Sequence, residues 1–215
     1  MNDISSFVVE ISIWALPTIF AICAHEVMHG VVALRLGDET ALRAGRLTLN
    51  PIVHVDPVGT ILMPAILLFM HLPVFGFAKP VPVDFRNLHP PRIGMLLVAA
   101  AGPATNAVLA VASAIVMRAA MHLVGGPLGM AVALPVAYMM QASVIINIAL
   151  GVFNLIPLLP LDGGRVLAAL LPPAAARVYA GFERYGFLIL LVLLYSHSVG
   201  RVINPIINAI ARVLL

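Results

Sequence analysis

The sequence predicts an all-α polytopic membrane protein, with about four to six transmembrane or re-entrant helices and short edge β-strands near the membrane surface. Hydrophobic residues make up 62% of the 215 residues and charged residues only 10%, and the mean hydropathy is +1.08. A water-soluble domain of this length needs a much more charged surface. We therefore expect residues 1–215 to form a single integral membrane domain that contacts the lipid bilayer.

The distribution of charge argues against nucleic acid as a partner and predicts an orientation. The 12 Lys and Arg residues are spread singly, without a basic run. Residues 1–34 contain none of them, so we expect no cleaved signal peptide. The positive-inside rule then places the amino terminus outside and most basic residues in the cytoplasm. The preference for Arg and Ala over Lys is typical of a prokaryote with a GC-rich genome, which predicts a plasma-membrane location.

The first half of the chain predicts one long helix and two short strands. The helix covers about residues 4–36, long enough to span a bilayer. Apolar and polar residues alternate over Arg46–Asn50 and again over Phe77–Val83, where the prolines suit only an edge strand. Between them, residues 60–72 are apolar but too short for a span, which predicts a re-entrant or shallow segment.

The second half predicts two full-length spans, over about residues 92–121 and 129–155. Prolines and glycines in "IPLLPLDGGR" then interrupt the helix. Residues 185–195 are strongly apolar but short, and the number of crossings in the last 30 residues stays open. The tail predicts an amphipathic helix at the membrane interface, because its polar residues recur at helical spacing: Arg201, Asn204, Asn208 and Arg212.

The stretch "AICAHEVMHG", residues 21–30, puts His25, Glu26 and His29 inside the first predicted span. An ionisable residue there costs about 2.5–3.5 kcal/mol on insertion scales, so a functional role is expected. Histidines four residues apart lie about 40° apart on a helix, and both imidazoles can bind one zinc ion. Glu26 lies off the histidine stripe and can reach a metal-bound water as general base. The alternative is that each histidine is simply hydrogen-bonded in the core.

Asp162, in "LDGG", is the candidate third metal ligand. The predicted orientation brings it to the same depth as His25 and His29, in the cytoplasmic half of the membrane. Glu26 and Asp162 are also the two acids that we expect well inside the bilayer. The alternative role is an N-cap for the short helix that follows, for which Asp is well suited.

The segments "HEVMH" and "NLIPLLPLDGG" together resemble the site-2 protease family, the intramembrane zinc metalloproteases of peptidase family M50. The family motif N-x-x-P-x-x-x-x-D-G fits residues 154–163, and "AGPATN" and "LNPIVHVDPVG" also look like family segments. The resemblance covers roughly residues 20–170. It implies one Zn²⁺ per chain held by His25, His29 and Asp162, with Glu26 activating the water. It also implies that the substrates are transmembrane proteins cut within or near the bilayer. Without a PDZ or CBS domain, we expect a minimal form.

Roles are also predicted for residues outside the two motifs. Asn154 could donate a hydrogen bond to the oxyanion or orient a zinc ligand, or could bond to another helix. Asn106 could touch the site or only help its helix to pack. His54 could support or gate the site, or be a solvated loop residue. The two edge strands could hold an unwound substrate by strand addition, through Val81 and Val83.

Two other functional classes fit parts of the sequence. Intramembrane His, Glu and Asp residues also mark ion paths, so a metal or proton transporter is the second hypothesis. Few polar residues continue the path to the outer side of the predicted spans, which argues against it. The third hypothesis is a non-catalytic protein that binds helices. A homo-oligomer is compatible with all three.

Overall fold

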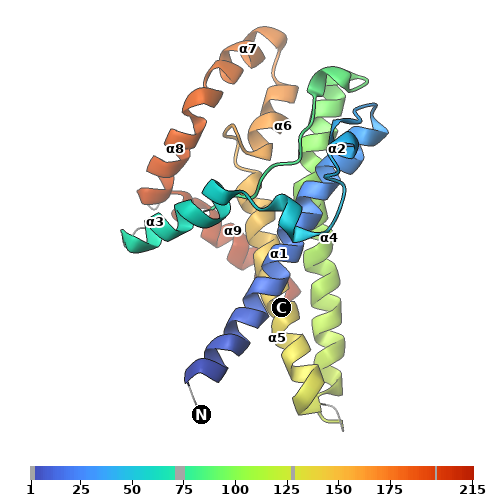
Figure 1. Cartoon of the computed structure of the whole chain (residues 1–215), viewed down its shortest axis with the longest axis vertical. Helices are drawn as coiled ribbons and strands as arrows, with labels where there is room; N and C mark the ends of the chain where they lie inside the picture. Colours follow the sequence, from blue (N-terminus) through green and yellow to red (C-terminus); the bar gives the residue numbers. More distant parts are fainter. Residues whose placement is uncertain (1–2, 71–75, 127–128, 197) are drawn as a thin grey trace.

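The computed structural model of the chain describes residues 3–70, 76–126, 129–196 and 198–215. Three long helices run side by side: α1 (Asp3–Arg35), α4 (Pro91–Leu123) and α5 (Leu134–Asn154) (Figure 1). A helical turn, Gly129–Ala133, leads into α5. All three helices are long and apolar enough to cross a membrane. The prediction of a multi-pass helical membrane protein is therefore confirmed.

Small side chains allow α4 to pack closely against its neighbours. Alanines and glycines dominate its buried face, and Ala110 and Ala114 form an apolar cluster with Val144 and Ile148 of α5. Inside a membrane, helices associate mainly through such close packing, since lipid is as apolar as a leucine surface. Large apolar side chains instead cover the outer faces of the bundle, for example Val108 and Ile115. This pattern suits a surface that contacts lipid.

Short helices and irregular segments connect α1 to α4 in the chain; this loop layer begins beside the carboxyl end of α1 and extends, in its middle part, away from the three long helices (Figure 1). The helices of this layer are α2 (Thr40–Arg43), α3 (Met63–Phe69) and the single turns Pro51–His54, Pro57–Leu62 and Phe85–Asn87. Pro57–Phe69 is apolar but short, as predicted for this part of the chain. Residues 71–72 of the predicted shallow segment lie outside the described residues.

The prediction of edge β-strands is wrong. None of the residues that the structure describes forms a strand, and both Arg46–Asn50 and Phe77–Val83 are irregular. Pro80 and Pro82 have no N–H group, so the second segment cannot pair regularly with a neighbour. The Arg46 guanidinium instead donates to the Lys79 carbonyl at 2.6 Å. The two segments are thus joined by a side chain and not by a ladder.

After α5 the chain breaks, and its described residues then form four further helices. They are α6 (Asp162–Leu170), α7 (Pro173–Gly181), α8 (Glu183–Tyr195) and α9 (Ser198–Leu214). The prolines of the 155–161 connection interrupt the helix as predicted. α7 and α8 meet at 62° and together could form a fourth, broken span.

The amphipathic character predicted for the tail is confirmed in α9. Its apolar side, with Ile207, Ala211 and Leu214, packs against the cluster between α4 and α5. All four residues of the predicted polar stripe are exposed: Arg201, Asn204, Asn208 and Arg212. A location of α9 at the membrane interface stays a prediction.

Candidate metal centre

His25 and His29 lie on the face of α1 that packs against α4, because residues four apart share one side of a helix. Both are buried, with exposed fractions of 6% and 8%. Their rings meet edge to face with centroids 4.7 Å apart. The two Nε2 atoms are 3.0 Å apart, so both rings direct the same nitrogen into one small volume.

Asp162 brings a carboxylate into this volume from α6. Its Oδ2 lies 3.1 Å from the Nε2 of His25 and 3.4 Å from the Nε2 of His29. The three candidate ligand atoms all lie within 4.8 Å of one another. Asp162 is the first residue of α6, and the N-cap is Leu161 without any side-chain cap. The carboxylate therefore does not cap its helix, and the alternative role considered for Asp162 is wrong.

The hydrogen-bond partners of these groups suit a cation. The Nδ1 of His29 lies 2.7 Å from the Val98 carbonyl, which can only accept, so the neutral ring carries its proton on Nδ1. Its Nε2 then offers a lone pair. The buried Oδ2 of Asp162 has no hydrogen-bond donor. Two nitrogens and one carboxylate oxygen would supply the three protein ligands that catalytic zinc sites use.

Gly102 of α4 allows the close approach of the two histidines. A Cβ atom there would overlap Cε1 of His25 and lie 2.5 Å from the Nε2 of His29. Any side chain at this position would push into the space where the nitrogens converge. Gly102 thus lets α4 pack closely against α1, and the atoms that come close to it belong to the site itself.

Glu26 lies beside the two histidines and contacts the irregular segment 76–84. Its Oε2 accepts a hydrogen bond of 2.8 Å from the backbone N–H of Val81. The buried Val81 side chain covers the next turn of α1, where a Cβ on Gly30 would lie 2.9 Å from Val81 Cγ1 and 2.5 Å from Leu47 Cδ2. The structure thus brings Val81 to the candidate base through its backbone, without a strand.

Segment 76–84 is held by hydrogen bonds at both ends. At one end, the Phe77 N–H donates to the Gly59 carbonyl at 3.1 Å. At the other, the Asp84 N–H donates to the buried Asp38 carboxylate at 2.8 Å. Burial would raise the pKa of Asp38, but hydrogen bonds from Thr40, Asn87 and Asp84 outweigh it and lower the pKa. An ionised Asp38 therefore anchors the segment that reaches Glu26.

The other predicted site residues differ in their distance from the cluster. Asn106 adjoins it, with Oδ1 2.6 Å from the Nδ1 of His25. Asn154 donates to the Leu150 carbonyl of its own helix at 3.0 Å. His54 is buried, and its Nε2 lies 2.8 Å from the Thr48 carbonyl. It therefore belongs to the loop layer and is not a solvated residue. Val83 packs against the apolar cluster around Leu88.

Arg92 was not predicted as part of the site, yet it positions α6. Its guanidinium donates to the carbonyl of Ala169 at 2.9 Å and to the carbonyl of Leu171, both at the carboxyl end of that helix. A cation at a helix carboxyl end is favourable, because the last carbonyls have no partners within the helix. The sequence contains no signal for this contact beyond a basic residue at the start of a span.

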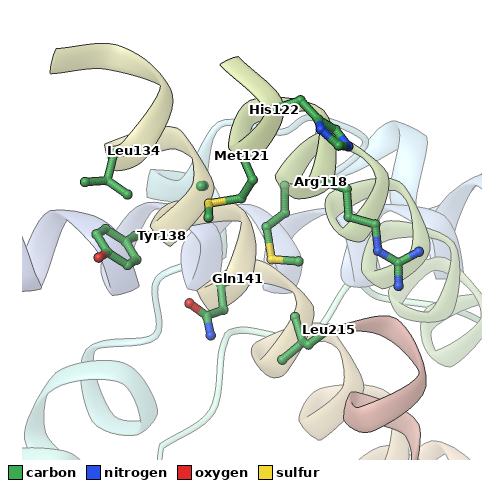
Figure 2. A pocket seen from close by; sticks show the side chains of 9 residues that line it. Arg118, Met121, His122, Leu134, Tyr138, Gln141 and Leu215 are labelled. Atoms are coloured by element: carbon green, nitrogen blue, oxygen red, sulfur yellow. The ribbon is translucent and has the colours of Figure 1, made fainter. Parts of the chain in front are cut away.

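A cleft of about 370 Å³ lies at the other end of the bundle, between α4, α5 and the last residue of the chain. Figure 2 shows its labelled side chains: Arg118, Met121, His122, Leu134, Tyr138, Gln141 and Leu215. Arg118 donates to the Leu214 carbonyl at 3.1 Å and so caps the end of α9. On α4, the cleft is lined by residues near Arg118, far along the helix from Gly102, which contacts His25. It contributes no residue to the metal cluster.

Comparisons with known proteins identify the family. The sequence profile of Peptidase family M50 matches residues 114–195, a range that contains Asp162. YwhC of Bacillus subtilis (strain 168) is 38% identical to the chain over 185 residues, which are 86% of this chain and 81% of the relative. The chain belongs to peptidase family M50. This membership makes it a protease, and it confirms the resemblance seen in the two motifs.

Two further M50 relatives are more distant. Rip2 of Mycolicibacterium smegmatis is 27% identical, over 94% of this chain and 72% of the relative. Rip2 of Mycobacterium tuberculosis H37Rv is 29% identical, over 90% and 69%. Each of the three relatives is named a "Putative zinc metalloprotease", which supports zinc as the metal. No solved structure matches the chain.

Proposed function

We propose that this M50 peptidase is a zinc-dependent intramembrane endopeptidase that hydrolyses peptide bonds in transmembrane segments of other membrane proteins. His25, His29 and Asp162 hold one Zn²⁺, and Glu26 is the general base. The observation that carries the proposal is the convergence of two Nε2 atoms and one carboxylate oxygen beside Glu26. Zinc, when bound, supplies a Lewis acid that polarises the scissile carbonyl and acidifies water.

Glu26 is oriented for proton transfer by the contact it makes with Val81. The Val81 N–H occupies Oε2, which leaves Oε1 free to take a proton from the attacking water. The water oxygen bonds to the carbonyl carbon, the C–N bond breaks, and Glu26 returns the proton to the leaving nitrogen. The protonated carboxyl thus acts as general acid in the second half of the reaction.

The substrate must be unwound before it is cut, because the peptide groups of a helix are shielded by their own hydrogen bonds. We propose that the unwound stretch lies along segment 76–84, beside Val81 and Val83. Support comes from the irregular backbone of this segment and from its contact with Glu26. We also propose Asn154, at the end of α5, as a donor to the oxyanion. In this role its amide must leave the Leu150 carbonyl, to which it donates in the structure.

The proposed orientation has the metal centre in the cytoplasmic half of a prokaryotic plasma membrane. Its support is that α2, α6, α7 and the carboxyl end of α1 gather at one end of the bundle (Figure 1). The predicted orientation assigns nine of the 12 Lys and Arg residues to the cytoplasmic side: Arg35, Arg43, Arg46, Lys79, Arg86, Arg92, Arg165, Arg177 and Arg184. Cytoplasmic segments near membrane spans carry such an excess.

The decisive experiment uses Glu26→Gln, which removes the base and leaves the three candidate ligands. Wild type and variant are reconstituted in liposomes with single-span reporter proteins, and cleavage and zinc content are measured together. We expect about one zinc per chain in both, with cleavage reduced at least about 10²-fold in the variant. Glu39→Gln, an exposed acid paired with Arg43 at 2.8 Å, is the matched control and should cut normally. A Glu26→Gln protein that cuts at the wild-type rate would contradict the proposal.

A transporter receives less support from the structure. Among the described residues, His25, His29 and Asp162 form one metal-binding group, and no second such group continues a path across the membrane. The buried polar residues beyond His25 are amides and hydroxyls, all of them hydrogen-bonded. Ion relays need titratable or coordinating groups along the path. The same liposomes, loaded with a zinc-sensitive dye, should show no zinc uptake.

A further inference from the structure

A buried chain of hydrogen bonds leads from His25 across α4 into α5. The Nδ1 of His25 lies 2.6 Å from Oδ1 of Asn106 in α4. Nδ2 of Asn106 donates in turn to Oδ1 of Asn147 in α5, at 2.9 Å. The two asparagines are 0% and 1% exposed, although both lie in apolar spans. Buried amides without partners are costly, so a chain that pairs them is strongly specified.

The far end of this chain is a backbone carbonyl. Nδ2 of Asn147 donates to the carbonyl oxygen of Ser143, one turn earlier in α5, at 2.9 Å. It also lies 3.2 Å from the Ser143 hydroxyl, which is 2.8 Å from the hydroxyl of Ser113 in α4. A hydroxyl can donate or accept, but a carbonyl oxygen can only accept. This carbonyl therefore fixes the direction of every bond between it and His25.

The Ser143 carbonyl determines which atom of each amide donates and which accepts. The atom of Asn147 that faces the Ser143 carbonyl must be the NH₂ group, so its oxygen faces Asn106. Asn106 must then present its own NH₂ group to Asn147 and its oxygen to His25. An amide oxygen only accepts, so the proton of the neutral His25 ring lies on Nδ1. The lone pair is left on Nε2, the atom that faces His29 and Asp162.

His29 reaches the same state by a shorter route. Its Nδ1 lies directly against the Val98 carbonyl of α4, at 2.7 Å. Both candidate ligands are thus held with Nε2 free, one by a carbonyl of α4 and the other by a carbonyl of α5 through two amides. The orientation of a metal-bound histidine is commonly set by the bond that its other nitrogen makes.

We propose that Asn147 is a positioning residue of the metal centre, which fixes the amide orientation of Asn106 and, through it, the tautomer of His25. Among the described residues, the side chain of Asn147 bonds to Asn106 and Ser143 and is not a member of the metal-binding group. Its effect on the site passes through Asn106. The inference rests on the proposed function only for the binding of zinc at this cluster, and it does not depend on which bond the protein cuts.

The first test measures zinc affinity by chelator competition in detergent-purified protein. Loss of a group that orients a metal ligand commonly costs 10–100-fold, so we expect about that loss for Asn106→Leu and about tenfold for Asn147→Leu. Ser143→Ala keeps the decisive carbonyl and should bind within about twofold of wild type. Thr105→Val is the matched control, because its hydroxyl donates to the Ala101 carbonyl of its own helix and takes no part in the chain from His25 to Ser143. Wild-type affinity in a folded Asn147→Leu protein would overturn the proposal.

The second test separates positioning from packing. Because Asn147 acts through Asn106, the double variant Asn106→Leu/Asn147→Leu should bind zinc no more weakly than Asn106→Leu alone. Two independent packing defects would instead lose affinity additively, and that result would overturn the proposal.

A third measurement needs no variant of Asn147. In ¹⁵N-histidine-labelled, metal-free wild type, nuclear magnetic resonance should show His25 protonated on Nδ1, with its signal assigned from a His25→Gln sample. A neutral His25 ring with its proton on Nε2 and none on Nδ1 would overturn the proposal, even if Asn147→Leu failed to fold. Zinc binding with the expected tautomer but without any proteolysis would contradict the proposed function alone.

Discussion

The absence of a side chain at Gly102 is a condition for the metal cluster. Gly102→Ala would force the new Cβ into the imidazoles of His25 and His29, whose Nε2 atoms lie 2.6 and 2.5 Å from its position. Because the backbones of α1 and α4 are packed over many residues, the rings must move. We expect zinc affinity to fall by about 10–100-fold, as for other changes that misalign ligands.

Gly151→Ala provides the matched control for this prediction. Gly151 is also buried, in α5, but the nearest atom to a Cβ there is Asn106 Cβ at an ordinary 3.5 Å. Alanine favours helices more than glycine by about 1 kcal/mol, so neither variant should lose helical stability through the backbone. Chelator competition and thermal unfolding on both proteins check the prediction. Equal zinc affinity in the two variants would show that the rings tolerate the added methyl group.

The four residues of the proposed centre could be predicted from sequence because their signals are local. His25, Glu26 and His29 share one helical turn, and Asp162 stands out as an acid in an apolar context. Asn147 carried no comparable signal, since an isolated Asn in a span is often only an interhelical hydrogen bond. Its link to His25 depends on the register between α4 and α5. The clue available was spacing: Asn106 and Ser113 are seven residues apart, and Ser143 and Asn147 four, so each pair shares a helix face.

Segment 76–84 contacts Glu26 of the proposed centre through one backbone N–H. Val81→Pro removes this group, so Glu26 loses the 2.8 Å hydrogen bond that orients its carboxylate. We expect slower cleavage of single-span reporters, by about tenfold for one lost hydrogen bond to a charged group, with zinc content unchanged because no candidate ligand is touched. Cleavage in liposomes and metal analysis of the same sample provide the measurement.

Two controls distinguish the backbone from the side chain of Val81. Val81→Ala keeps the N–H and should cut faster than Val81→Pro. Val83→Pro changes a residue that packs near Leu88, away from Glu26, and should slow cleavage less than Val81→Pro. Undiminished cleavage by Val81→Pro would mean that the contact with Glu26 has no role in the reaction.

The helices were more predictable than the loop layer, for a physical reason. Apolar runs of span length have few alternatives in a bilayer, so α1, α4 and α5 follow from composition and length. Alternation over Phe77–Val83 also suits a strand, but a strand needs a partner with free N–H and carbonyl groups. This segment instead bonds to the side chains of Arg46 and Glu26 and to the separate carbonyls of His54 and Gly59. Such isolated long-range contacts leave no periodic signal in a sequence.

In the whole molecule, the proposed metal centre connects parts of the fold that are far apart in the chain. His25 and His29 come from α1 and Asp162 from α6, and these helices are joined in the structure chiefly through α4. Arg92 holds the other end of α6 to α4. A bound ion at the cluster would add a direct link between α1 and α6. Because it binds only the folded arrangement, it must also stabilise that arrangement.

Removal of zinc should therefore lower the melting temperature of the wild type but not that of Asp162→Ala. At a free zinc concentration about 100 times the Kd, binding stabilises by about 2.7 kcal/mol. With about 2–4 °C per kcal/mol for a chain of this length, a chelator should lower the Tm by roughly 5–10 °C. Asp162→Ala should contain little zinc, so the chelator should leave its Tm unchanged, whereas Glu39→Ala should respond like wild type. If Asp162→Ala kept about one zinc per chain and showed the same decrease in Tm, the third ligand would have to come from another residue.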